Sequence, residues 1–349
     1  MPVTFPERGY LRPENLAYSS RRPETNGEIR ARPEDFRVDE RLGFDLEDTG
    51  QHLWLRIRKT GYTTEQVAGL LARQAGVLRR AVSYAGMKDR QAVTRQWFSV
   101  DLAGRPSPEW SQQLPSDVVV EAQRFHRRKL RRGALASNQF EITISSIEGD
   151  VSEIQNRLSE VATRGVPNYF GPQRFGIDGR NVERAWKLIV EHKSERDRHR
   201  RSLMFSTARG LLFNRVLSAR VELRSWDQAL DGDVMQLDGS RSVFDVEHVD
   251  EILAERLRTF DVHATGPLWG RGRSRVRGLA SELESQALTD CRDWREGLEH
   301  AGLEQSRRAL RVPVRGLVWH WLDEQSLWLS FTLPPGAYAT SVLREVINV

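Results

Sequence analysis

The chain has 349 residues, enough for two domains of ordinary size, and its 39% hydrophobic and 29% charged content is typical of a soluble globular protein. No apolar run approaches the roughly 20 residues of a membrane span, and residues 1–8 lack the blocks of a signal peptide, so we expect a cytoplasmic protein without membrane contact. The single cysteine, Cys291, excludes an internal disulfide and argues against a thiolate zinc site.

Arginine carries most of the positive charge. The formal net charge is only +5, but all but five of the 53 basic residues are arginines. A GC-rich genome alone would produce this bias, yet the arginines also cluster, in residues 124–132, 196–201 and 271–277. Guanidinium groups bind phosphates bidentately. The clusters therefore favour a nucleic-acid partner, and the candidate phosphate contacts of the first cluster are Arg127, Arg128, Lys129 and Arg131.

The first half of the chain predicts a strand-rich region. Residues 28–40 read as short extended pieces interrupted by a proline, and residues 52–58 alternate apolar and polar side chains as a half-buried strand does. A helix should follow, because Thr63 and Gln66 form a capping box and Gly76 suits the position just past the helix end. Further strands are predicted at 81–84, 97–100, 118–122 and 138–145.

From about residue 164 onward, predicted helices dominate. They cover residues 181–192, 203–220, 246–258 and 279–299. Strands return at 316–321 and 327–333, and 339–347 is a final helix. This order of strand-rich, helix-rich and strand-rich regions indicates a second domain inserted into the first. We expect residues 1–163 plus 313–349 to form the first domain and residues 164–312 to form the inserted one.

The segment AGMKDRQAVTRQW, residues 85–97, holds more polar chemistry than a turn between two strands needs. It sets Asp89 beside Lys88, with Thr94 and Gln96 leading into the next strand. Read alone, the segment could also be a loop closed by an Asp–Arg pair. The sequence contains no GxxxxGK[ST] phosphate loop, HExxH pair or GxSxG elbow. These patterns predict a carboxylate-centred site that works without a cofactor or a metal.

Several motifs carry a family resemblance. GMKDRQAVTRQW resembles the GxKDxxAxTxQ signature of the TruD family of tRNA pseudouridine synthases, and residues 165–176 resemble the second signature of that family. Similar segments occur in family order at 33–36, 133–140 and 333–342. The resemblance implies an α+β fold: a pseudouridine-synthase-like mixed, mainly antiparallel sheet flanked by helices, with an inserted, helix-rich α/β domain.

The resemblance also implies a reaction, the isomerisation of one uridine in tRNA, at position 13 in bacterial members. The glycosidic bond to N1 breaks, the uracil turns, and C5 bonds to the same sugar carbon, with no cofactor. Asp89 is by resemblance the catalytic aspartate, which attacks the sugar or the base or removes a sugar proton. Lys88 is expected to favour the charged form of this carboxylate, with Thr94 and Gln96 supporting it.

The resemblance further implies residues that bind the base. Phe36 and Phe140 match aromatic positions that stack on the flipped uridine, and the Asn138 amide could read the uracil edge beside them. Phe140 also shares a strand face with two isoleucines, so a role in the core is an alternative. Tyr338 falls where a phenylalanine is usual, and Arg30 falls where family members commonly carry a lysine near the active site.

In the inserted domain, Asn168, Gln173 and Arg174 are expected where the two domains meet, either at the site or as hinge packing. The arginine clusters would bind tRNA phosphates. Two other functions stay open. One is a tRNA-binding protein that remodels RNA without chemistry, and the other is a metal-dependent nuclease built on Asp231 and Asp233, which could equally form a turn. We expect a monomer that needs no protein partner.

Overall fold

The computed structural model describes residues 15–112 and 114–349, so the expectation drawn from residues 1–8 lies outside the described part. The chain divides into two compact units. The sheet unit comprises residues 24–151, 314–336 and 347–349. The helical unit comprises residues 152–313 and 337–346, together with the described residues up to 23.

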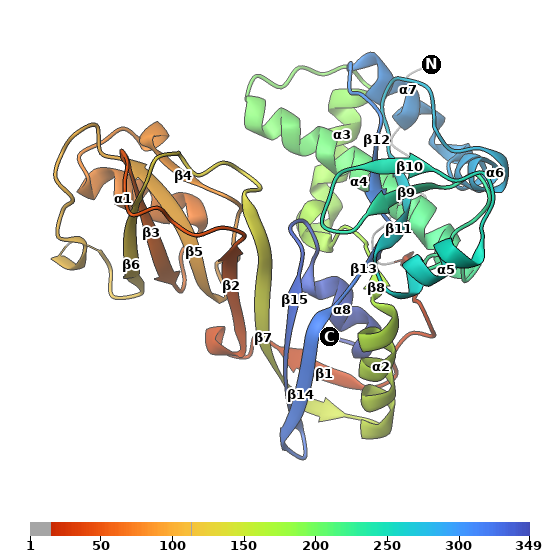
Figure 1. Cartoon of the computed structure of the whole chain (residues 1–349), viewed down its shortest axis with the longest axis horizontal. Helices are drawn as coiled ribbons and strands as arrows, with labels where there is room; N and C mark the ends of the chain where they lie inside the picture. Colours follow the sequence, from red (N-terminus) through yellow and green to blue (C-terminus); the bar gives the residue numbers. More distant parts are fainter. Residues whose placement is uncertain (1–14, 113) are drawn as a thin grey trace. The chain divides into compact units, whose positions relative to one another are not determined.

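The sheet unit is built on one nine-stranded sheet in the order β14-β15-β7-β2-β5-β3-β6, with β1 paired to β7 and β4 paired to β5 (Figure 1). Among the described residues, every strand pair of this sheet is antiparallel except β2 with β5. This mixed, mainly antiparallel sheet with helices confirms the predicted α+β class. The strands are β1 (Asn26–Ile29), β2 (Phe36–Leu42), β3 (His52–Lys59), β4 (Val82–Tyr84), β5 (Val93–Asp101), β6 (Val118–His126), β7 (Leu135–Glu148), β14 (Arg315–Asp323) and β15 (Ser326–Leu333).

Helix α1 (Thr64–Gln74) packs on this sheet and begins where the sequence predicts. The Thr63 hydroxyl accepts a hydrogen bond from the Gln66 N–H (3.2 Å), and the Gln66 side chain accepts one from the Thr63 N–H (2.8 Å). This is the predicted capping box. Leu71 is fully buried in an apolar cluster with residues of β3, β4 and β5. Gly76 follows the helix end at a φ of +61°, which favours glycine.

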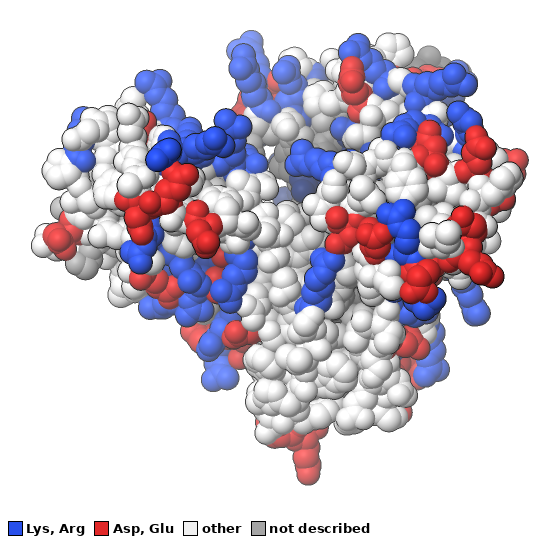
Figure 2. Space-filling view, viewed as in Figure 1, with Lys and Arg blue, Asp and Glu red and all other residues white. Residues whose placement is uncertain are grey.

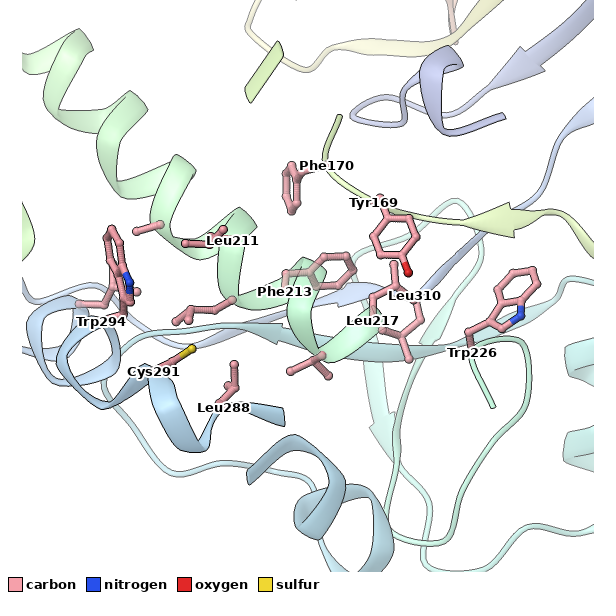
Figure 3. Close-up of a cluster of buried hydrophobic side chains, with 14 of the residues drawn as sticks. Tyr169, Phe170, Leu211, Phe213, Leu217, Trp226, Leu288, Cys291, Trp294 and Leu310 are labelled. Atoms are coloured by element: carbon pink, nitrogen blue, oxygen red, sulfur yellow. The ribbon is translucent and has the colours of Figure 1, made fainter. Parts of the chain in front are cut away.

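Helix α4 (Arg198–Glu222) forms the core of the helical unit. Three consecutive residues in its middle, Leu211, Leu212 and Phe213, are all buried. A helix on a protein surface would expose one side of such a run, so α4 is surrounded by other elements. Figure 3 shows Leu211 and Phe213 in the cluster that also contains Tyr169 and Trp294. The other helices are α2 (Val151–Arg164), α3 (Arg180–Ile189), α5 (Glu251–Arg258), α6 (Gly278–Ala287), α7 (Arg292–His300) and α8 (Ala339–Val346).

The helical unit also contains strands that the sequence analysis did not locate. Four antiparallel strands form a sheet in the order β10-β9-β11-β12, and a two-stranded ladder joins β8 to β13. Their bounds are β8 (Val166–Pro167), β9 (Val234–Leu237), β10 (Val243–Asp245), β11 (Val262–Leu268), β12 (Ser306–Ala309) and β13 (Arg311–Val312).

Several element boundaries differ from those predicted; the helix expected over 246–258, for example, begins only at Glu251. The expected helix over 279–299 is divided between α6 and α7 by a tight turn at Thr289–Cys291. Residues 93–96, expected in a loop, already belong to β5. The units also group the chain differently from the expected domains, since α8 and nearly all of α2 lie in the helical unit. None of the helices in the described residues has the length and apolar character to span a membrane.

Candidate active site

The segment between β4 and β5 is held in place by hydrogen bonds from neighbouring elements of the sheet unit. The Thr64 hydroxyl at the start of α1 accepts from the Lys88 N–H (2.9 Å) and donates to Gln96 Oε1 (3.0 Å). Gln96 Nε2 in turn donates to the carbonyl of Gly86 (2.5 Å). Gln96 is fully buried. This predicted residue therefore holds the segment in position from within the core.

Lys59, at the end of β3, supports the backbone of Asp89. Its Nζ donates to the carbonyl oxygens of Asp89 and Tyr62, both at 2.8 Å. Burial lowers the pKa of Lys59 to about 8, although the nearby Asp89 carboxylate raises it in part. Thr94 lies opposite Lys59 in the β3–β5 register and is also fully buried. Thr94 therefore belongs to the packing beneath the segment.

The Asp89 carboxylate is oriented by two groups. Its Oδ2 pairs with Arg30 Nη2 (3.0 Å), and its Oδ1 accepts a hydrogen bond from the Gln91 N–H (3.0 Å). The side chain keeps 29% of its surface exposed, so a substrate can reach it. The Arg30 guanidinium also lies over the ring of Phe36, 4.3 Å from the ring centroid, a cation–π distance. Arg30 thus links the carboxylate to an aromatic cluster.

Three phenylalanines form that cluster on one face of the sheet. Phe140 of β7 stacks on Phe331 of β15, with ring centroids 5.4 Å apart and an angle of 24° between the rings. Phe36 of β2 meets Phe140 edge to face, with centroids 6.2 Å apart. All three rings are buried, and Phe331 is only 1% exposed. The cluster therefore packs as part of the core, as the alternative reading of Phe140 expected, and its part in stacking on a base stays a prediction.

Lys88 turns away from the Asp89 carboxylate. Its Nζ forms an ion pair with Glu40 Oε2 (2.9 Å) and donates to Asn138 Oδ1 (2.6 Å). The Lys88 side chain is 7% exposed and that of Glu40 is fully buried. Burial raises the pKa of Glu40, and the Lys88 ammonium opposes this shift. The cation that pairs with Asp89 is Arg30, in place of the Lys88 that the sequence suggested.

Three of the predicted residues of the helical unit, Asn168, Arg174 and Tyr338, form hydrogen bonds within that unit. Arg174 Nη2 donates to the Tyr338 hydroxyl (3.0 Å). The Asn168 side chain donates to the Ala309 carbonyl (2.8 Å) and accepts from Arg308 (2.5 Å). These contacts position the side chains within the helical unit. Base binding by Tyr338, and support of the site or RNA binding by Asn168 and Arg174, stay predictions. Gln173 is exposed.

The first basic cluster lies on the surface of the sheet unit. Arg127, Arg128, Lys129 and Arg131 are all exposed. Arg127 pairs with Glu47 (3.3 Å), whereas Arg128 and Arg131 have no carboxylate partner among the described residues. Figure 2 shows one face of the molecule, on which basic and acidic side chains lie close together over much of the surface. Arginines without an acidic partner are therefore better indicators of phosphate binding than the total number of arginines.

A pocket of about 340 Å³ lies beside the first half of α4, within the helical unit. Arg198, Arg201 and Arg209 line it, together with Phe170 and Phe205. None of these three arginines pairs with a carboxylate in the part of the chain that the structure describes. Cations without acidic partners beside aromatic rings suit phosphate and base together.

The acidic pair considered for a nuclease has other partners. Asp233 is buried and its carboxylate forms a two-oxygen pair with Arg220 (3.1 and 3.0 Å). Asp231 accepts from the Val249 N–H (2.9 Å) and lies near His248. These hydrogen bonds close a loop, in line with the turn reading of this segment.

Sequence reasoning missed three residues of the site: Glu40, Lys59 and Phe331. Each lies on a strand. Glu40 and Phe331 fall in segments predicted only as extended or strand, and Lys59 directly follows the strand predicted over 52–58. A charged residue at a core position of a strand is a usable signal for Glu40 and Lys59, since such residues are rarely buried without a partner.

Comparisons with known proteins agree across sequence and structure. The family model described as tRNA pseudouridine synthase D (TruD) matches residues 14–197 and 194–346. A tRNA pseudouridine synthase D from Methylococcus capsulatus is 47% identical over 322 residues, which are 92% of this chain and 91% of that relative. Another from Nitrosococcus oceani is 46% identical over 335 residues, 95% of this chain and 94% of the relative. The fold is similar to that of a TruD protein from Methanosarcina mazei, with a TM-score of 0.73 at 22% identity over 95% of this chain and 96% of the other.

Proposed function

This chain belongs to the TruD family of tRNA pseudouridine synthases, and from that membership we propose that it isomerises uridine 13 of tRNA at the site around Asp89. In this reaction the bond between N1 and the sugar C1′ breaks, and a bond from C5 to C1′ forms. The proton on C5 is lost and N1 gains one, so nothing is added or removed overall. The site therefore has to provide an ionised group, an apolar surface for the uracil and polar groups at its edge.

The observation that carries the proposal is the setting of the Asp89 carboxylate. A guanidinium and a backbone N–H hold its two oxygens, at 3.0 Å each, while the side chain stays partly exposed. Both contacts orient the carboxylate, the group that can attack the sugar or the base or remove a sugar proton.

The aromatic cluster supports the same assignment. A uracil stacked on an aromatic ring gains about 1–3 kcal/mol, while extruding a nucleotide costs a few kcal/mol. The Arg30 guanidinium lies over the Phe36 ring, Phe36 meets Phe140 edge to face, and Phe331 stacks on Phe140. We assign this surface to the extruded base, with Asn138 at its edge.

The arginines support tRNA as the partner. Arg128 and Arg131 of the sheet unit and Arg198 and Arg201 of α4 are exposed cations that can bind phosphates, because no carboxylate pairs with them in the described residues. Such contacts set affinity and carry little sequence information. We further infer a cytoplasmic monomer that acts without a cofactor or a protein partner.

The test is release of tritium from tRNA labelled at C5 of uridine. The protein should release tritium without cleaving the RNA, and a tRNA with cytidine at position 13 should lose that release. Asp89→Asn should bind tRNA with near-normal affinity and release nothing. The matched control is Asp323→Asn, because Asp323 also accepts a hydrogen bond from the N–H two residues later (2.8 Å) and lies in the same unit. If the wild-type protein binds tRNA but releases no tritium, the function that remains is that of an RNA-binding protein that remodels RNA without chemistry.

A further inference from the structure

A buried charged pair lies directly beneath the side chain that we assign to the uracil edge. Glu40 of β2 and Asn138 of β7 are opposite each other in the antiparallel register. The Lys88 ammonium lies between their side chains, 2.9 Å from Glu40 Oε2 and 2.6 Å from Asn138 Oδ1. The Glu40 side chain is fully buried, so this carboxylate has no access to an RNA substrate. Its role has to be exerted through its neighbours.

The pair determines which way round the Asn138 amide faces. An ammonium group can only donate hydrogen bonds, so the amide atom next to Lys88 must be the oxygen. The amide Nδ2, with its two donors, then takes the opposite direction. No residue in the described chain forms a hydrogen bond with Nδ2, and Asn138 is partly exposed. The site therefore presents a donor, and an amide turned by 180° would present an acceptor.

We propose that Glu40 and Lys88 are positioning residues that fix this donor and thereby make Asn138 select uracil over cytosine. The inference rests on the proposed function, because it takes the extruded base to lie at the aromatic cluster. Uracil carries a carbonyl oxygen at C4, which can accept a hydrogen bond from Nδ2. Cytosine carries an amino group there, so that two donors would face each other and both would stay unsatisfied.

Glu40 is needed because Lys88 is buried. A buried ammonium without a counter-ion tends to lose its proton. A neutral amine has a lone pair that can accept a hydrogen bond from Nδ2, so both orientations of the Asn138 amide would then be allowed. The Glu40 carboxylate keeps the donor-only ammonium in place. The charges of Glu40 and Lys88 thus fix the orientation of the neutral Asn138 amide.

The experiment measures binding of two tRNAs that differ only in carrying uridine or cytidine at the target position. Asp89→Asn is the parent protein, so that no turnover interferes. We expect the parent to prefer uridine by about 5- to 100-fold, the range of one satisfied against one unsatisfied buried hydrogen bond. Adding Asn138→Asp, which keeps the size of the side chain and removes the donor, should reduce the preference to about twofold or less.

Glu40→Gln tests the pair itself. This variant keeps the shape of the side chain and an acceptor for Lys88 but removes the negative charge. We expect it to lose most of the preference for uridine. The mean affinity for the two tRNAs should change little. The thermal unfolding of the variant is measured alongside, and Asn138→Asp keeps the test decisive if Glu40→Gln does not fold. Glu141→Gln, one residue from Phe140 on the other side of the same strand, should keep the full preference.

The outcomes separate this inference from the proposed function. If the wild-type protein isomerises uridine but Asn138→Asp or a folded Glu40→Gln keeps the parent preference, the inference is overturned and the proposed function stands. If the variants lose the preference while the wild-type protein releases no tritium, the amide still reads the base and the proposed reaction fails.

Discussion

Replacing Arg30 separates two contributions that its guanidinium makes to the Asp89 site. Nη2 lies 3.0 Å from Asp89 Oδ2, and the guanidinium carbon lies 4.3 Å from the centroid of the Phe36 ring. Arg30→Lys keeps the positive charge but loses the flat group over the ring. Arg30→Met keeps the apolar stem and loses the charge. The two variants together show which contact the reaction needs.

The structure sets the size of each effect. A hydrogen bond to a charged group contributes about 1.5–3 kcal/mol. Because 21% of the Arg30 side chain and 29% of the Asp89 side chain are exposed, solvent screens the pair, and we take the lower part of that range, about 1.5–2 kcal/mol. Arg30→Met should therefore lower kcat by about 10- to 30-fold. A cation–π contact contributes about 0.5–1 kcal/mol at such a site, so Arg30→Lys should lower kcat only about two- to fivefold.

The assay is tritium release from C5-labelled tRNA at saturating RNA, with the dissociation constant measured separately. Both variants should bind tRNA within a few-fold of the wild type, since a single cation changes phosphate binding only modestly. Equal losses of kcat in the two variants would refute a role for the positive charge of Arg30 and would assign its contribution to the guanidinium over Phe36, which both variants lack.

Three further predictions concern stability and RNA binding. Gly165→Ala should destabilise the fold by more than about 3 kcal/mol, because φ is +71° and the new Cβ would meet a backbone carbonyl oxygen at 2.3 Å. Its control, Gly302→Ala, has a φ of +77° with open space around it and should cost about 1–2 kcal/mol. Equal decreases in Tm for the two variants would refute this difference. The pKa of Lys59, about 8, lies below the 10.5 of an ordinary lysine, so the unfolded chain binds more protons between these pH values. The free energy of unfolding should therefore rise from pH 8 to 10, and denaturant titrations should show a smaller rise in Lys59→Met. Arg201→Gln should weaken tRNA binding and reduce the slope of log K against log salt by about 1, and an unchanged slope would mean that this side chain contacts no phosphate.

The parts of the fold that depend on residues close together in the sequence were predictable from it. The start of α1 is one, because both partners of its capping box, Thr63 and Gln66, lie within one turn. The strands of the helical unit were not predictable in the same way. Strand β11 contains Gly266 and Pro267, which read locally as a break, and it is a strand because β9 and β12 pair with it from distant segments.

The site shows the same division between local and distant information. Asp89 stands out from its own segment, but its partner Arg30 comes from the segment after β1. Lys88 seemed to serve Asp89 because the two are adjacent in sequence, yet neighbouring side chains point in different directions, and the acceptors of Lys88 lie on β2 and β7. Only the pairing of those two strands brings Glu40 and Asn138 together. No sequence pattern within one segment contains that pairing.

The hydrogen bonds that hold the segment around Asp89 have a thermodynamic consequence for the RNA. Five residues in a row of six, residues 85, 86 and 88–90, have a backbone group bonded to another element. Ordering the backbone costs about 1–2 kcal/mol of conformational entropy per residue, roughly 5–10 kcal/mol for the five. That entropy is lost when the protein folds, before any tRNA binds. The contacts made by the incoming uridine are thus available for lifting the base out of the RNA stack.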